Sequence, residues 1–239
     1  MTFIASGRDR PEAAYRPHPL QDPMKQSELN KMVGACLKRE GKTLGWKTKA
    51  HNAFRVEGDM FFSLLISGDA KEKTLYRRLS CKPMAFDAEL WNILGMTANL
   101  QEPLGLRADG AYTLFGIALY EGSIEVAEWN DEGLLNSTRQ CLLEANASIE
   151  SNQHLRTIDA FMKMGEAFNL DILKRVPNTA WNFWKERLIC HRLKGEMKQA
   201  TAIAEARISA GDSGRFVIGG QTFYQLAQRL AQGHSVPAG

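Results

Sequence analysis

The hydrophobic period of the chain changes near residue 130, and this change constrains the fold more than any other feature. Between residues 44 and 129, short runs rich in aromatic and β-branched residues are separated by turn residues such as Gly58-Asp59, a pattern typical of strands. Beyond residue 130, apolar residues recur every three or four positions, as in amphipathic helices. The chain is therefore predicted to be an α+β protein with a helical carboxyl-terminal half.

The strand pattern predicts an antiparallel sheet of about five strands, covered by helices on one face. The expected strands are Leu44–Lys49, Ala53–Glu57, Met60–Ser67, Thr74–Lys82 and Tyr112–Tyr120, with a weaker sixth candidate at Ile124–Trp129. Strands and helices do not alternate as they do in dinucleotide-binding folds, which argues against a parallel sheet.

Helical spacing of apolar residues predicts a first helix that carries Leu29, Val33 and Leu37 on one face. Asp22 before Pro23 is the expected N-cap, and Gly41 is expected near the end of this helix. Further helices are expected at Phe86–Leu94, from Leu134 to Ile149, from Leu155 to Met162, from Trp181 to Leu188, at Glu196–Ser209 and at Gln221–Gln232.

Composition divides the chain into three parts. Residues 1–23 contain four prolines and no apolar periodicity, which predicts a flexible amino-terminal extension. Residues 24–130 are expected to form the sheet domain, and residues 131–239 a helical region packed on it. Because the chain lacks both a run of about 18 apolar residues and a secretory signal, a cytoplasmic location is expected.

The sequence offers no motif that predicts a catalytic residue, a metal ligand or a cofactor. Gly211-Asp212-Ser213-Gly214 resembles the nucleophile segment of trypsin-like serine proteases, but the helical pattern before it does not fit their β-barrel, so a turn is expected. The four cysteines and five histidines are scattered without metal-binding spacing, and Cys190-His191 is expected to be a core thiol beside a surface imidazole. Asp87 and Glu89 are two residues apart, which places them on different faces of a helix.

A set of cationic and aromatic residues on the predicted strands is the most informative polar feature. These candidate partner-binding residues are Trp46, Lys47, Lys49, Arg55, Tyr76, Arg78 and Lys82. Alternation along Thr74–Lys82 places Tyr76, Arg78 and Lys82 on one face, while Arg77 falls on the apolar face. If the strands pair in the expected order, one open surface of the sheet is basic with aromatic platforms.

Such a surface has three interpretations. It could bind an acidic protein through arginine contacts, hold single-stranded nucleic acid by stacking and phosphate contacts, or simply guard the sheet against aggregation. The net charge is only +3, and Glu57, Asp59, Asp69 and Glu72 interrupt the positive field. A protein partner is therefore favoured over nucleic acid, and an enzyme whose site cannot be read from the sequence stays an alternative.

One stretch of the chain resembles a family of uncharacterised bacterial domains that are often encoded beside polymorphic toxins and regarded as their immunity proteins. The residues that carry this resemblance are Leu44–Lys49, with its Gly-Trp-Lys, followed by Asn52–Val56 and Phe61–Leu64. The resemblance implies a helix-plus-sheet fold and a protein-binding role, with a toxin as the partner. It implies no catalytic residue and no ligand.

Overall fold

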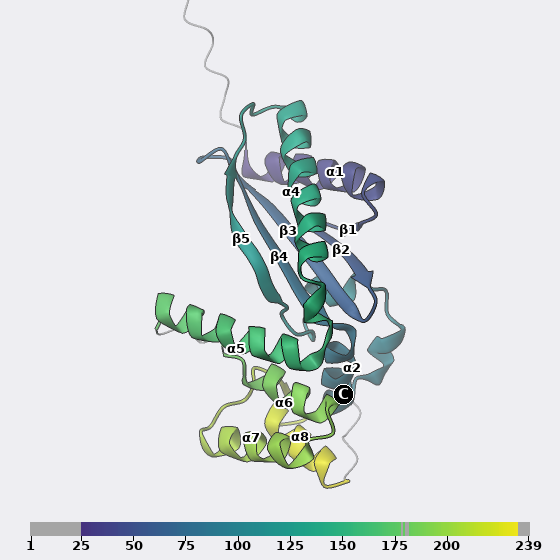
Figure 1. The fold of residues 1–239 in the computed structure, drawn as a ribbon, viewed down its shortest axis with the longest axis vertical. Helices are drawn as coiled ribbons and strands as arrows, with labels where there is room; N and C mark the ends of the chain where they lie inside the picture. The colour runs from purple at the N-terminus through teal and green to yellow at the C-terminus, as the bar shows by residue number, and fades with distance from the viewer. Residues whose placement is uncertain (1–24, 178, 180–181, 234–239) are drawn as a thin grey trace, which may run out of the picture.

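The computed structural model describes residues 25–177, 179 and 182–233. The extension predicted at residues 1–23, the expected N-cap Asp22 and the histidines His18 and His234 lie outside these residues. Figure 1 shows a sheet with two helices over one face and a cluster of helices at one end of the sheet. The α+β class expected from the change of hydrophobic period is confirmed.

The sheet is an antiparallel meander of five strands. They are β1 (Lys47–Lys49), β2 (Asn52–Glu57), β3 (Met60–Asp69), β4 (Thr74–Pro83) and β5 (Ile117–Glu125), and they pair in chain order. Gly58 adopts a positive φ of 56° in the turn between β2 and β3, which glycine tolerates without strain.

The last strand differs from the expectation, because β5 contains only residues 117–120 of the first candidate and 124–125 of the second, joined in one strand. The chain enters the sheet at Ile117, after Gly116 has passed close to β4. A Cβ atom on Gly116 would lie 2.7 Å from the backbone oxygen of Cys81, so the loop is too close to the sheet for any side chain here.

Two helices, α1 (Gln26–Thr43) and α4 (Asp131–Ser151), pack against each other and on one face of the sheet (Figure 1). Leu29, Val33 and Leu37 of α1 are fully buried, as their spacing predicts. Gly41 lies in the last turn of α1, near the end of the helix as expected. A Cβ atom there would lie 2.9 Å from Thr48 Cγ2, so the glycine lets α1 approach β1 closely.

The remaining helices cluster at the end of the sheet (Figure 1). They are α2 (Met84–Leu94), η1 (Thr97–Gln101), α3 (Leu106–Asp109), η2 (Gln153–Arg156), α5 (Ile158–Arg175), α6 (Trp184–Leu193), α7 (Met197–Ser209) and α8 (Phe223–Ala231), with the short strands β6 (Val217–Ile218) and β7 (Gln221–Thr222) before α8. Phe86 of α2 packs edge-on against Phe161 of α5, with ring centroids 4.9 Å apart. Because α2 also contacts α6 and α8, packing crosses residue 130, and the division into domains stays a prediction.

The segment Gly211–Gly214 forms the expected turn. Gly211 and Gly214 have positive φ angles of 69° and 65°, and the Asp212 carboxylate accepts a hydrogen bond from the Gly214 backbone nitrogen. Ser213 Oγ accepts a hydrogen bond from the Arg215 backbone nitrogen. Ser213 therefore helps to close a turn between α7 and β6.

Candidate functional site

The register of the strands places five residues in one row across the open face, the face of the sheet opposite α1 and α4. Lys49 lies opposite Asn52, Asn52 opposite Leu65, Leu65 opposite Arg78, and Arg78 opposite Glu121. The row therefore runs from a cation on β1 to a carboxylate on β5. Leu65 and Asn52 separate Lys49 from Arg78 by three strand spacings, about 14 Å.

Neighbouring rows carry two more of the predicted residues. Tyr76 lies opposite Ser67 and Ser123, on the side of Arg78 away from the helical cluster. Lys47 lies opposite Phe54, one row closer to the cluster, and is exposed. The structure thus brings Lys47, Lys49, Tyr76 and Arg78 to one face, as alternation along the strands predicts.

Trp46 and Arg55 do not belong to the open face, which corrects their assignment to the partner-binding surface. Trp46 is only 4% exposed, and its Nε1 donates a hydrogen bond to Asn146 Oδ1 of α4 at 2.9 Å. Arg55 Nη1 donates to the same oxygen at 2.8 Å, and the Arg55 guanidinium lies 5.5 Å from the centre of the Trp46 ring. Both side chains hold α4 on the covered face of the sheet.

Lys82 also requires a correction, because it shares the strand face of Tyr76 and Arg78 but is 2% exposed. Its Nζ lies 2.8 Å from Asp87 Oδ2 and donates hydrogen bonds to the backbone oxygens of Arg107 and Leu114, at 2.9 and 2.7 Å. Burial lowers the pKa of the Lys82 ammonium, while the Asp87 carboxylate opposes that shift. Lys82 therefore anchors the loop of residues 107–116 and is not available to a partner.

Asp87 is the acceptor at the centre of this arrangement. It lies in the first turn of α2 and is fully buried. Its Oδ1 accepts hydrogen bonds from Lys82 Nζ and from the Leu114 backbone nitrogen, both at 3.0 Å. Its Oδ2 lies 3.2 Å from Arg107 Nη1. The sequence pattern predicts a helix around Asp87, but two of its partners, Arg107 and Leu114, lie 20 and 27 residues later in the chain.

Carboxylates accompany the cations of the open face. Glu121 lies 3.4 Å from Tyr76 Oη, 3.9 Å from Arg78 Nε and 3.4 Å from Arg175 Nη1 of α5. Burial and then the Glu121 charge raise the pKa of Tyr76. At the other edge, Lys49 Nζ lies 2.8 Å from Asp109. The open face therefore carries charges of both signs.

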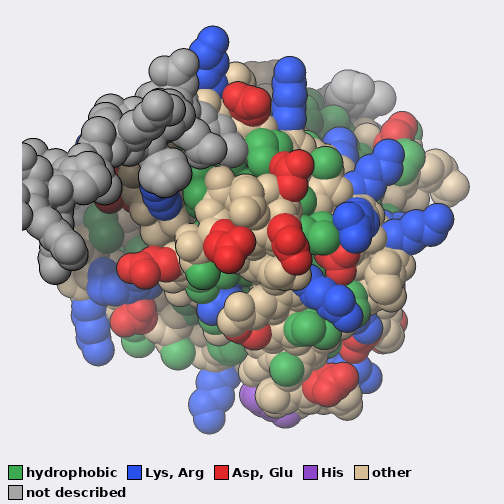
Figure 2. Space-filling view, turned by 90° about the horizontal axis from the view of Figure 1, so that it is seen from above, with side chains coloured by type: hydrophobic (Ala, Val, Ile, Leu, Met, Phe, Trp, Pro, Cys, Tyr) green, Lys and Arg blue, Asp and Glu red, His purple; other side chains and the backbone are tan. Residues whose placement is uncertain are grey.

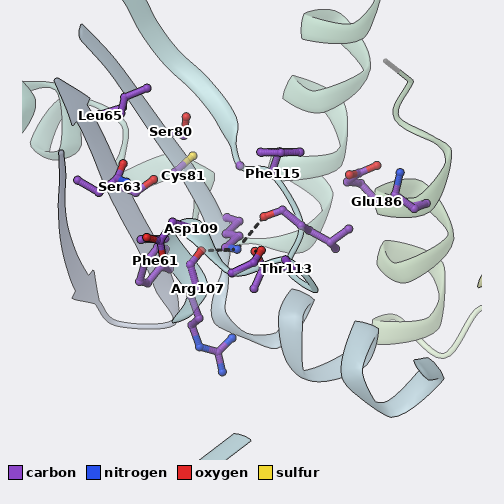
Figure 3. A pocket seen from close by; sticks show the side chains of 18 of the residues that line it. Phe61, Ser63, Leu65, Ser80, Cys81, Arg107, Asp109, Thr113, Phe115 and Glu186 are labelled. Atoms are coloured by element: carbon purple, nitrogen blue, oxygen red, sulfur yellow. Dashed lines mark hydrogen bonds between the residues drawn. The ribbon is translucent and has the colours of Figure 1, made fainter. Parts of the chain in front are cut away.

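A cavity of about 600 Å³ lies where the open face meets the helical cluster. One wall is formed by β3 and β4, with Phe61, Ser63 and Leu65 among the side chains that line it (Figure 3). A second wall is the loop of residues 107–116, which Lys82 anchors. The third is the start of α6 with the segment before β6. Segments far apart in the sequence thus line one space.

Glu186 is the most unusual polar group of this cavity. It extends from α6 on the side opposite the sheet strands (Figure 3) and is 4% exposed, and its Oε2 is buried without a hydrogen-bond partner in the described part of the chain. Burial raises the pKa of the Glu186 carboxyl, although Lys185 beside it opposes the shift. Sequence reasoning did not find Glu186, Lys185 or Arg215, because no local pattern places the start of α6 over the sheet.

Among residues 25–177, 179 and 182–233, no group of three or more His, Cys, Asp or Glu is arranged to hold a metal ion. Cys190 is buried, and the neighbouring His191 Nδ1 lies 2.6 Å from Glu196 Oε2. None of the helices that the structure describes combines the length and apolarity needed to cross a membrane. Comparison with protein-family models, curated proteins and solved structures finds no match for this chain.

Proposed function

We propose that the protein binds another protein through the open face of its sheet. The observation that carries this proposal is the row from Lys49 to Glu121, which presents an amide, an apolar side chain and charges of both signs on one surface. We call Lys47, Lys49, Tyr76, Arg78 and Glu121 the open-face patch. With α1 and α4 on the opposite face, this patch is the side of the sheet that a partner can reach.

The charge pattern favours protein over nucleic acid as the partner. Nucleic-acid binding relies on a continuous positive track that follows the phosphates. Here Glu121 lies beside Arg78, and Asp109 lies beside Lys49, so two of the cations already face a carboxylate. Basic and acidic side chains are also interspersed at the end of the molecule away from the helical cluster (Figure 2). A protein surface with a complementary mixture of charges fits this pattern better.

The partner that we propose to test first is a bacterial toxin, in the cytosol. This choice rests on the resemblance of Leu44–Lys49 and the following strands to domains regarded as immunity proteins. The patch contains three cations and one carboxylate, so the complementary surface of the toxin is expected to be mainly acidic. Tyr76 supplies an aromatic ring to the patch, one row beyond Arg78, and aromatic residues often contribute strongly to binding.

The proposal can be tested with a photo-crosslinking amino acid placed at Ser123, which is exposed next to Tyr76. Irradiation in cells should give one discrete adduct, and mass spectrometry should identify the partner. The matched control carries the same amino acid at Glu150, an exposed position on α4, and should not give this adduct.

Calorimetry with the purified partner then tests the individual residues. Tyr76→Ala and Arg78→Ala should each weaken binding at least about tenfold, which corresponds to about 1.4 kcal/mol. Lys38→Ala, at an exposed position on α1, should leave the affinity unchanged. Equal adducts from Ser123 and Glu150, or full affinity after both patch substitutions, would contradict the proposal, and an adduct removed by nuclease would point to nucleic acid instead.

A further inference from the structure

We propose that the cavity between the open face and α6 binds a small organic anion with an apolar body. This inference goes beyond protein binding at the open-face patch, because the groups that carry it come mainly from the loop of residues 107–116 and from the helical cluster. The open-face patch and the cavity share Arg78, and Asn52 and Leu65 of the row across the open face also line the cavity.

The size and the apolar lining of the cavity suit the body of such a ligand. Small-molecule sites usually enclose about 300 to 1,000 Å³, and this cavity has a volume of about 600 Å³. Phe61, Leu65 and Phe216 contribute apolar surface to its walls. Phe115 is 72% exposed, although it lines the cavity, and Figure 3 shows it between the sheet and α6. A ligand held here would cover the Phe115 ring and remove apolar surface from water.

The cations of the cavity give the expected charge of the ligand. Lys82 and Arg107 already contact Asp87, and Figure 3 shows the Arg107 guanidinium turned away from the cavity. Lys185 and Arg215 have no ion-pair partner within the described residues, and Lys185 Nζ lies 6.0 Å from the centre of the Phe216 ring. These two side chains are therefore left to neutralise an anionic group.

Arg78 adds a third cation from the sheet. Its Nε is buried and makes no hydrogen bond within the described residues, because the nearest carboxylate oxygen, on Glu121, is 3.9 Å away. A buried guanidinium nitrogen without a hydrogen bond is costly, and an acceptor in the cavity would relieve that cost. Arg78 thus lines the cavity from the wall opposite Lys185.

Glu186 fits an anionic ligand in its neutral form. Its Oε2 is buried without a partner, and burial favours the protonated carboxyl, which carries an O–H donor. A neutral carboxyl can donate a hydrogen bond to an oxygen of the ligand. The walls around these groups are already fixed, since Lys82 anchors the loop and Gly116 lies against β4. Fixed walls reduce the loss of conformational freedom on binding.

The test uses the full chain and four probe molecules, measured by calorimetry and by chemical shifts in NMR spectra. Phenyl phosphate combines an anion with an apolar ring, benzyl alcohol supplies a similar ring without the charge, and inorganic phosphate supplies the charge without the ring. Phenyl phosphate should bind at least about tenfold more tightly than either of the others. Binding of benzyl alcohol or inorganic phosphate at equal strength would overturn the proposal, as would tighter binding of benzylamine, which carries the opposite charge.

Substitutions then locate the site. Lys185→Met and Arg215→Met should each weaken phenyl phosphate binding at least about tenfold, because a charged hydrogen bond is lost. Lys47→Met, which removes an exposed cation of the same sheet face outside the cavity, should leave binding unchanged. An equal loss with Lys47→Met, or no loss with either cavity variant, would overturn the proposal.

Glu186 is tested by a pair of variants whose folding is first checked by thermal unfolding. Glu186→Gln keeps a hydrogen-bond donor and should retain binding, whereas Glu186→Leu removes it and should weaken binding. Full binding by Glu186→Leu, or an equal loss of binding in both variants, would contradict a hydrogen bond donated by neutral Glu186 to an anionic ligand. Because Lys185, Arg215 and Glu186 lie outside the open-face patch, failure here is distinguishable from failure of the protein-binding proposal.

Discussion

Trp46 donates its indole Nε1–H to the side-chain oxygen of Asn146, which lies 2.9 Å away and 100 residues later in the chain. The same oxygen accepts a hydrogen bond from Arg55 at 2.8 Å. One amide on α4 therefore accepts hydrogen bonds from two donors in the strand region. Since a buried donor without an acceptor is costly, this contact fixes how α4 sits on the sheet.

Asn146→Ala should lower the free energy of unfolding by about 1 to 3 kcal/mol, because it leaves the Trp46 and Arg55 donors without their acceptor. Urea denaturation followed by tryptophan fluorescence measures this change. Asn136→Ala is the matched control, at an exposed position on the same helix, and should change stability by less than about 0.5 kcal/mol. Equal effects of the two substitutions would show that the amide does not hold α4.

Asp87→Ala should destabilise the protein by about 3 to 5 kcal/mol, because it leaves the buried Lys82 ammonium without its carboxylate. Asp109→Ala, which breaks the partly exposed pair with Lys49, should cost only about 0 to 1 kcal/mol. Chemical denaturation of the two variants gives the comparison. A cost for Asp87→Ala no larger than that for Asp109→Ala would rule out a structural role for the Lys82–Asp87 pair.

Glu186→Gln should stabilise the protein increasingly as the pH rises above the ordinary carboxyl pKa of 4.5. Burial raises the pKa of Glu186 above its ordinary value of 4.5, so the folded chain holds the proton more tightly than the unfolded chain. The protonated group stabilises the fold below that ordinary value, and the contribution is lost as the pH rises through the folded pKa. Each unit by which the pKa is raised corresponds to about 1.4 kcal/mol.

Denaturation of the Glu186→Gln variant at several pH values measures this difference, with Glu150→Gln at an exposed site of α4 as the control. A difference between the Glu186 variant and the original protein that stays constant across this pH range would mean that Glu186 ionises as readily in the folded chain as in the unfolded one.

Cys36 should react with an aromatic disulfide reagent before the other three cysteines. Burial raises the pKa of Cys81 and Cys190 to about 12 and that of Cys141 to about 11, and all three side chains are buried. Cys36 is partly exposed, and its pKa is also raised, so it should react slowly rather than not at all. A thiol titration should find one reactive group in the folded protein and four in urea, and Cys36→Ser should abolish the first.

Alternation along a single strand could be predicted from the sequence, whereas the faces of different strands could not be matched. Tyr76, Arg78 and Lys82 share a face of β4 because successive side chains point to opposite sides, and Arg77 falls on the other face for the same reason. Whether Arg55 joins them depends on the register between β2 and β3. That register pairs Arg55 with Phe62 and so turns it toward α4.

Burial by distant segments could not be predicted either. Lys82 lies on the expected face, but the loop of residues 107–116 folds over that end of the sheet and encloses its Nζ. Nothing within a few residues of Lys82 signals this loop, which begins about 25 residues later in the chain. The cavity escaped prediction for the same reason, since Glu186 and Arg215 meet the strands only through tertiary packing.

The order of the strands bears on how the protein is made. Each strand pairs with its neighbour in the chain, so the five strands can form the sheet while synthesis is still in progress. Helix α4, which packs on β3 and β4, leaves the ribosome only after β5 is complete. Until then, part of the apolar face of the sheet is exposed to solvent. We therefore expect a fragment that ends at residue 130 to aggregate or to need a chaperone.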